Sequence, residues 1–174
     1  FEQDSDTRNL ARLRTELGHM QMRLDPPEAA EAKTILERAA RELEWSNASA
    51  VDKVANQLGL ARAHLLLGDA DAAAEQSAQT YELARDQAPL TAADALVLRG
   101  QIAAAQGRTS DAAASYHEAI LLLSGVGADR RAAELWFELG GLLQDVGEAT
   151  AALDAYRRAA ASTASGTVTI VTTG

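Results

Sequence analysis

Apolar residues recur along most of this chain at intervals of three and four residues, which is the spacing of one face of an α-helix. Trp136, Leu139 and Leu143 show the pattern in one segment, where Gly140 leaves room for a second helix to approach closely. The pattern predicts eight helices, over residues 6–24, 28–44, 49–67, 70–86, 91–106, 109–124, 129–146 and 149–162.

Turn-forming residues separate these segments. Glycine, which favours the end of a helix, lies at three of the boundaries: Gly68, Gly107 and Gly147. The run Asp25-Pro26-Pro27 places proline early in a helix, where it is tolerated. Two pairs have the spacing of a capping box and predict helix starts: Ser49 with Asp52, and Thr91 with Asp94.

The tail differs in kind from the rest of the chain. Residues 163–174 are rich in β-branched side chains, which favour extended structure. Two interpretations remain open: a frayed end, or an extended segment that docks on the helices or on another copy. The predicted division is a helical domain over residues 1–162 and an extended or disordered tail over 163–174.

The helical segments repeat in pairs. Positions of the unit at 136–159 recur about 40 residues earlier, at Leu96, Gly100, Gly107, Ala112, Tyr116 and Ala119. A weaker copy carries Leu60-Ala61, Gly68 and Ala73, and a degenerate one carries Leu17-Gly18, Ala32, Leu36 and Ala39. A helix pair with one apolar face cannot bury that face alone, so stacked copies are expected to share a continuous core.

This unit resembles the tetratricopeptide (TPR) repeat. Trp136, Leu139, Gly140 and Leu143 fit the pattern W-x₂-L-G-x₂-Y, and Ala152 and Tyr156 fit the A-x₃-F of the second helix. The resemblance implies an all-α fold, a right-handed α-solenoid of about four TPR-like helix pairs. The usual period is about 34 residues, so the longer units here indicate a divergent array.

Composition narrows the possible functions. With 16 Lys and Arg against 25 Asp and Glu, the net charge is −9, and only two residues are lysines. Direct nucleic-acid binding is therefore not expected, because it needs clustered basic side chains. The chain has no cysteine, no signal peptide and no apolar run long enough to cross a bilayer. A cytoplasmic protein without membrane contact is the expectation.

The sequence contains no recognisable catalytic, metal-binding or phosphate-binding motif. The histidines, His19, His64 and His117, lack the i, i+4 spacing of a helical zinc site. Asp69-Ala70-Asp71 lacks the central glycine and final glutamate of a calcium loop, and the glycines at 125 and 127 are too few for a phosphate cradle. We expect no enzyme activity, no metal and no cofactor.

A binding surface remains as the candidate site. In the TPR family the first helix of each unit lines a concave groove that binds peptides or protein segments. Carrying the groove positions over predicts these contact residues: Arg12, Thr15, His19, Leu58, Arg62, Leu65, Val97, Gln101, Phe137 and Gln144. With Asp94 and Glu134 at further groove positions, such a trough would be basic at one end, apolar in the middle and acidic at the other. The alternative is that these residues are only the exposed faces of core helices.

A narrower resemblance concerns the parent protein. Segments such as GADRRAAELWFELGGLLQDVGE are similar to the repeat halves of actinobacterial regulators that carry a Cro/C1-type helix-turn-helix domain ahead of their repeats. The chain begins at Phe1, which suggests an excised or processed piece. The hypothesis is the sensing and dimerisation half of a cytoplasmic transcription regulator, able to form a homodimer. The alternative is a free-standing scaffold or adaptor for protein assembly.

Overall fold

Eight α-helices and no strands make up the computed structural model, which describes residues 2–165. The helices are α1 (Glu2–Gln21), α2 (Ala29–Trp45), α3 (Ala50–Leu66), α4 (Ala70–Ala84), α5 (Pro89–Ala105), α6 (Thr109–Gly125), α7 (Asp129–Asp145) and α8 (Ala149–Ser165). All eight predicted helices are present, and the all-α prediction is confirmed. Helix α8 extends past the expected boundary at 162, and residues 166–174 of the predicted tail lie outside the described residues.

The helix starts follow the predicted turn chemistry in one case and depart from it in another. The backbone N–H of Asp52 donates to Ser49 Oγ over 3.2 Å, so Ser49 caps α3 as predicted. The predicted start at Thr91 is wrong: α5 begins at Pro89, and no side chain caps it. Proline suits a first helical position because its missing N–H would have no helical partner there.

Glycine makes the turns between paired helices tight. Gly107 and Gly147 have backbone φ angles of 74° and 83°, in the left-handed region that L side chains rarely adopt. Each lies between the two helices of one unit, and the short turn folds the second helix back against the first.

The two helices of a unit touch at the predicted small residues. A Cβ added at Gly100 would lie 2.8 Å from the Tyr116 ring, and one added at Gly140 would lie 2.7 Å from the Tyr156 ring. At the first unit, Gly18 faces Leu36 in the same way. This equivalence confirms the alignment of the first, third and fourth repeat units.

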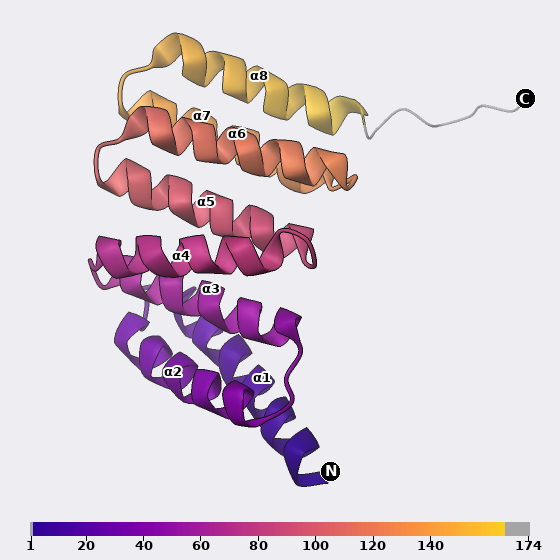
Figure 1. Ribbon diagram of the computed structural model, residues 1–174. Helices are drawn as coiled ribbons and strands as arrows, with labels where there is room; N and C mark the ends of the chain where they lie inside the picture. The colour runs from indigo at the N-terminus through magenta and orange to yellow at the C-terminus, as the bar shows by residue number, and fades with distance from the viewer. Residues whose placement is uncertain (1, 166–174) are drawn as a thin grey trace, which may run out of the picture.

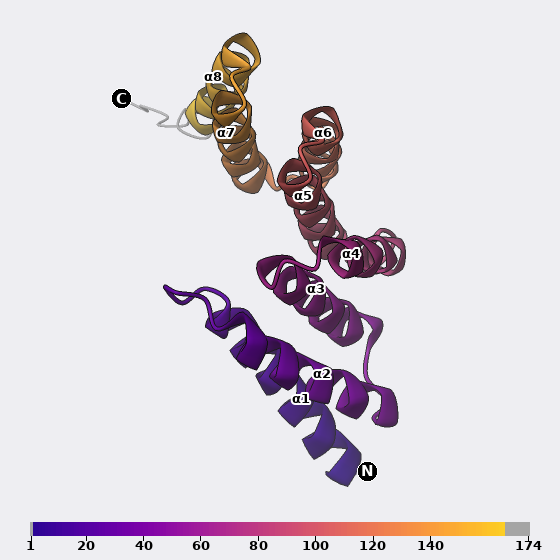
Figure 2. The ribbon, with the colours of Figure 1, turned by 90° about the vertical axis from the view of Figure 1, so that its left-hand side faces the viewer.

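The four helix pairs stack into one curved array (Figure 1). Along one side α3 contacts both α1 and α5, whereas α2, α4, α6 and α8 make no comparable contacts among themselves within the described residues. Figure 2 shows successive pairs rotated about the long direction of the array. We call the side lined by α1, α3, α5 and α7 the concave face.

No helix among residues 2–165 is both long and apolar enough to cross a membrane.

Candidate interaction surfaces

One repeat position of the predicted groove is part of the core. It is occupied by Thr15, Leu58, Val97 and Phe137 in the four successive units. The first three are buried, Val97 being only 4% exposed, whereas Phe137 is 63% exposed. The prediction that Leu58 and Val97 line an open groove is therefore wrong, whereas Thr15, although only 3% exposed, lines a hollow together with Arg12 and Ala55.

The physical reason is the packing of each unit on the one before it. Leu58 lies in a cluster with Ala95 and Leu98 of α5, and Val97 lies in a cluster with Leu135 of α7. Thr15 Oγ1 accepts a hydrogen bond over 3.2 Å from the side-chain amide of Asn56. At this repeat position the first helix of the following unit packs against the side chain. The side chain is exposed only at Phe137, which no later helix within residues 2–165 covers.

Polar groups on the first two units are mostly engaged with neighbours. Arg12 forms an ion pair with Asp52 at 3.2 Å, so the predicted basic end of the trough is neutralised. His19 Nε2 lies 3.0 Å from the carbonyl oxygen of Ala55. Burial lowers the pKa of His19, which favours the neutral ring donating its N–H to that carbonyl.

The seam between α5 and α7 is also internally paired. Arg131 lies 3.7 Å from Asp94, 3.2 Å from Glu134 and 3.5 Å from Glu138. The predicted acidic end of the trough is therefore compensated by a cation from the chain itself.

Arg62 is the exception on the concave face. Its side chain is half-buried, and within residues 2–165 it has no hydrogen bond and no ion pair. Burial lowers the pKa of Arg62, and the carboxylate of Asp94 acts against this effect. The guanidinium remains charged at neutral pH because its ordinary pKa is far above 7. Its five N–H donors are available to a ligand.

The remaining predicted residues lie in three successive units, on α3, α5 and α7. Gln101 is exposed on α5, one unit beyond Arg62 at the equivalent position. Leu65 is half-buried and packs against the cluster that contains Leu58. Gln144 accepts a hydrogen bond from the Tyr156 hydroxyl over 3.0 Å and belongs with Phe137 to the last unit.

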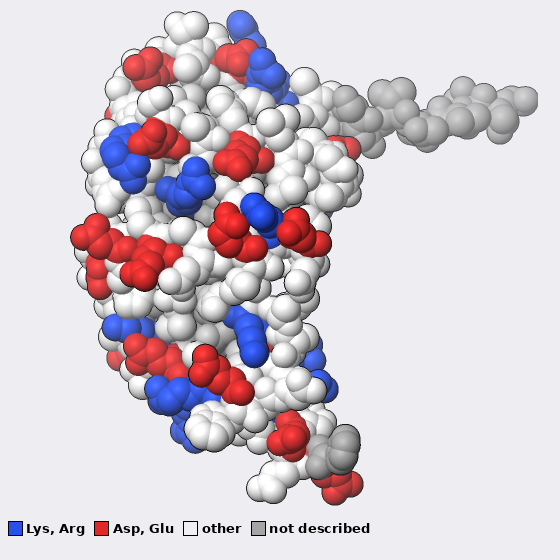
Figure 3. Space-filling model, in the orientation of Figure 1, with Lys and Arg blue, Asp and Glu red and all other residues white. Residues whose placement is uncertain are grey.

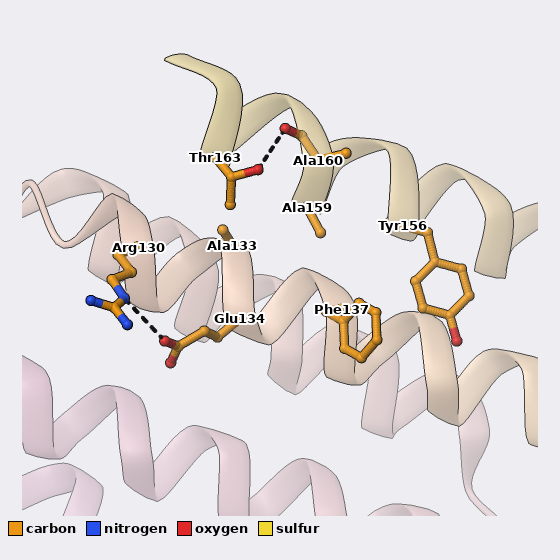
Figure 4. Close-up of a pocket in the computed structure, with 8 residues that line it drawn as sticks. All are labelled: Arg130, Ala133, Glu134, Phe137, Tyr156, Ala159, Ala160 and Thr163. Atoms are coloured by element: carbon orange, nitrogen blue, oxygen red, sulfur yellow. Dashed lines mark hydrogen bonds and ion pairs between the residues drawn. The ribbon is translucent and has the colours of Figure 1, made fainter. Parts of the chain in front are cut away.

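An apolar groove lies on the last unit, and the sequence interpretation did not anticipate it. It has a volume of about 680 Å³ and lies between α7 and α8. Figure 4 shows the residues that line it: Arg130, Ala133, Glu134, Phe137, Tyr156, Ala159, Ala160 and Thr163. The rings of Phe137 and Tyr156 are 5.3 Å apart, and Arg130 and Glu134 form an ion pair at 3.6 Å on one side. We call this the end groove.

Charges of both signs are distributed over the surface. In the view of Figure 3, acidic and basic side chains are interspersed along the molecule, and no large basic patch forms on this face. Among residues 2–165, no group of three or more histidine, aspartate or glutamate side chains is placed to hold a metal ion.

Comparisons with known proteins place the fold. No family model and no curated protein sequence matches the chain. Among solved structures it is similar to aspartyl phosphate phosphatase F from Bacillus subtilis, with a TM-score of 0.77 and 14% identity over 95% of this chain. It is also similar to BtubC from P. vanneervenii, with a TM-score of 0.69 and 14% identity over 94% of this chain and 73% of the other.

A third similar structure consists of nearly identical TPR-like repeats. It is a putative kinesin light chain from Podosopora anserina, with a TM-score of 0.53, 18% identity, and coverage of 94% of this chain and 99% of the other. At such identities the similarity concerns the fold alone: the chain is a solenoid of TPR-like helix pairs. It spans 42% of the length of phosphatase F.

Proposed function

We propose that this chain is a non-enzymatic interaction module that holds an extended peptide or protein segment along its concave face. The observation that carries the proposal is the half-buried guanidinium of Arg62, which has no hydrogen bond or ion pair among the described residues. A charge that is partly removed from water and has no hydrogen-bond partner is unfavourable, so a ligand that supplies a partner gains more than it would at an exposed arginine.

The chemistry of the ligand follows from the guanidinium. Its planar, forked donors fit a carboxylate in a bidentate geometry or the backbone carbonyls of an extended peptide. Asp94 is the carboxylate that acts most strongly on Arg62, and Arg131 already engages it at 3.7 Å. Gln101, exposed at the equivalent position of the next unit, already forms a side-chain hydrogen bond with Tyr116, and its remaining donor and acceptor capacity can serve the same peptide.

Within this role, we propose that the chain is the sensing half of a cytoplasmic transcription regulator. The support is the sequence resemblance to repeat halves that follow a helix-turn-helix domain. A scaffold or adaptor for protein assembly is the alternative, and it uses the same concave face. The presence of a helix-turn-helix domain in the same polypeptide would distinguish the two, because it supports the regulator.

The Arg62 prediction can be tested with selected peptides. Peptides are isolated from a random displayed library on the full chain, and their affinities are measured by fluorescence anisotropy. Arg62→Ala is expected to weaken binding at least about tenfold, since a charge-assisted hydrogen bond is worth about 1.5–3 kcal/mol. Arg62→Lys keeps the charge without the fork and should recover only part of the affinity.

Arg99→Ala is the matched control, because Arg99 is an exposed arginine on α5. It should leave peptide affinity unchanged, and thermal melts of all three variants should match the parent chain. If folded Arg62→Ala binds the selected peptides as tightly as the parent chain does, the concave-face assignment is wrong.

A further inference from the structure

The two ends of the array carry uncovered apolar surfaces that correspond to the two sides of an internal contact. That contact is the packing of α7 on the preceding pair, α5 and α6, in which Leu135 and Leu139 of α7 are fully buried. Counterparts of both contact surfaces, the one on the preceding pair and the one on the helix that packs on it, lie at the two ends of the molecule. No other described residue covers them.

The first side is the end groove. Six of its lining residues lie 40 positions after residues of the third unit: Ala93, Val97, Tyr116, Ala119, Ile120 and Leu123. All six of these earlier residues are buried, in one cluster with Leu135 and Leu139 of α7. The end groove therefore repeats the surface of the preceding unit on which α7 packs, and no other described residue covers it.

The second side is a stripe on α1. The alignment of Leu17-Gly18 with Leu139-Gly140 places Leu10, Leu13 and Leu17 at the positions of Ala132, Leu135 and Leu139. In α7 these residues are buried in the cluster that includes α5 and α6 of the preceding unit, whereas all three leucines of α1 are exposed. Leu13 is 68% exposed, although its counterpart Leu135 is completely buried. We call Leu10, Leu13 and Leu17 the leading stripe.

We propose that the leading stripe of one copy docks in the end groove of a second copy, so that the solenoid continues from one molecule into the next. The internal contact identifies α1 of a second copy as the binding partner. Helix α1 carries leucines at the positions whose counterparts in α7 pack on the preceding unit. The exposed apolar side chains of the leading stripe and the end groove favour burial against a partner.

The geometry of this contact dictates the type of assembly. Each copy uses one surface at one end and a different surface at the other, so the contact is heterologous. Heterologous contacts build open chains, or rings where the rotation between copies closes. A simple two-fold dimer is not the expected product.

The test uses two single variants of the full chain. Leu13→Glu places a charge in the leading stripe and leaves the end groove intact. Ala160→Glu places a charge on the exposed α8 side of the end groove and leaves the leading stripe intact. Leu121→Glu on α6 is the matched control, since Leu121 is exposed and belongs to neither surface. Circular dichroism melts establish that all variants are folded.

Sedimentation velocity from micromolar to millimolar concentration gives the readout. The parent chain and Leu121→Glu are expected to form assemblies that grow beyond two copies as concentration rises. Leu13→Glu and Ala160→Glu should each remain monomeric, and an equal mixture of the two should form a one-to-one dimer that grows no further. The mixture regains only one contact, because each variant contributes its single intact surface.

Three results would overturn the proposal. A parent chain that stays monomeric over this range shows that the ends do not join copies. Assembly that either folded variant leaves unchanged shows that copies meet through other surfaces. A failure of the two monomeric variants to pair when mixed shows that the leading stripe and the end groove are not partners.

Discussion

Replacing Gly100 with leucine should destabilise the chain by about 1–3 kcal/mol, the usual cost of overpacking a core. A Cβ at this position would lie 2.8 Å from the ring of Tyr116 and 3.2 Å from the backbone oxygen of Ala112. Tyr116 is buried and cannot turn into solvent, and burial raises its pKa to about 12. Chemical denaturation monitored by circular dichroism measures the loss. The equivalent Gly140→Leu should cost less, because Tyr156 is only half-buried.

Gly141→Ala is the control for this prediction. The nearest atom to its added Cβ is the Tyr156 hydroxyl oxygen, at an ordinary contact distance of 3.8 Å. Alanine also favours the helix by up to about 1 kcal/mol relative to glycine, so this variant should be neutral or slightly stabilised. A Gly100→Leu chain as stable as the parent would show that α5 and α6 do not approach closely at this point.

Asn56→Asp is expected to have a larger effect, a loss of about 3–5 kcal/mol at neutral pH, which is typical of an uncompensated buried charge. Asn56 is almost fully buried, and its side-chain amide donates to Thr15 Oγ1 over 3.2 Å and to the Leu36 carbonyl over 3.0 Å. The Thr15 hydroxyl itself donates to Ala11 at 3.0 Å. A carboxylate at position 56 would therefore face oxygens that cannot donate to it.

The pH dependence of the Asn56→Asp variant identifies the cause. Burial raises the pKa of the new carboxyl group above its unfolded value of about 3.9, so the folded state binds the proton more tightly. Stability is then retained below the unfolded pKa and lost as pH rises through the folded value. Asn56→Leu, which introduces no charge, should show no such pH-dependent loss relative to the parent chain. If the Asn56→Asp variant has parental stability at pH 7, the buried Asn56 contact between α1, α2 and α3 is contradicted.

The contacts within a unit could be predicted from the sequence because they depend on local spacing. Gly100 with Tyr116, and Gly140 with Tyr156, lie at fixed offsets set by two helices and a short turn, so the repeated pattern was enough. The start of α5 was less predictable. Thr91 and Asp94 have the spacing of a capping box, but Pro89 can begin the helix earlier without losing a hydrogen bond.

The contacts between units were harder to predict because they depend on the rotation between one helix pair and the pair before it. Val97 and Phe137 occupy the same repeat position, and an apolar residue there fits both a groove and a core. Only the packing of α7 on α5 and α6 buries the first and leaves the second exposed. The end groove could have been anticipated by asking which core positions lose their cover where the repeats stop.

Thiol labelling at this repeat position tests the stacking most directly. The chain contains no cysteine, so Val97→Cys and Phe137→Cys each introduce one thiol at equivalent places in successive units. At micromolar protein concentration, with both variants shown to be folded by thermal melts, a maleimide reagent reports the accessibility of each thiol. The stacking predicts fast labelling of Phe137→Cys and labelling of Val97→Cys slowed to the rate of local opening. Equally fast labelling at both positions would contradict it.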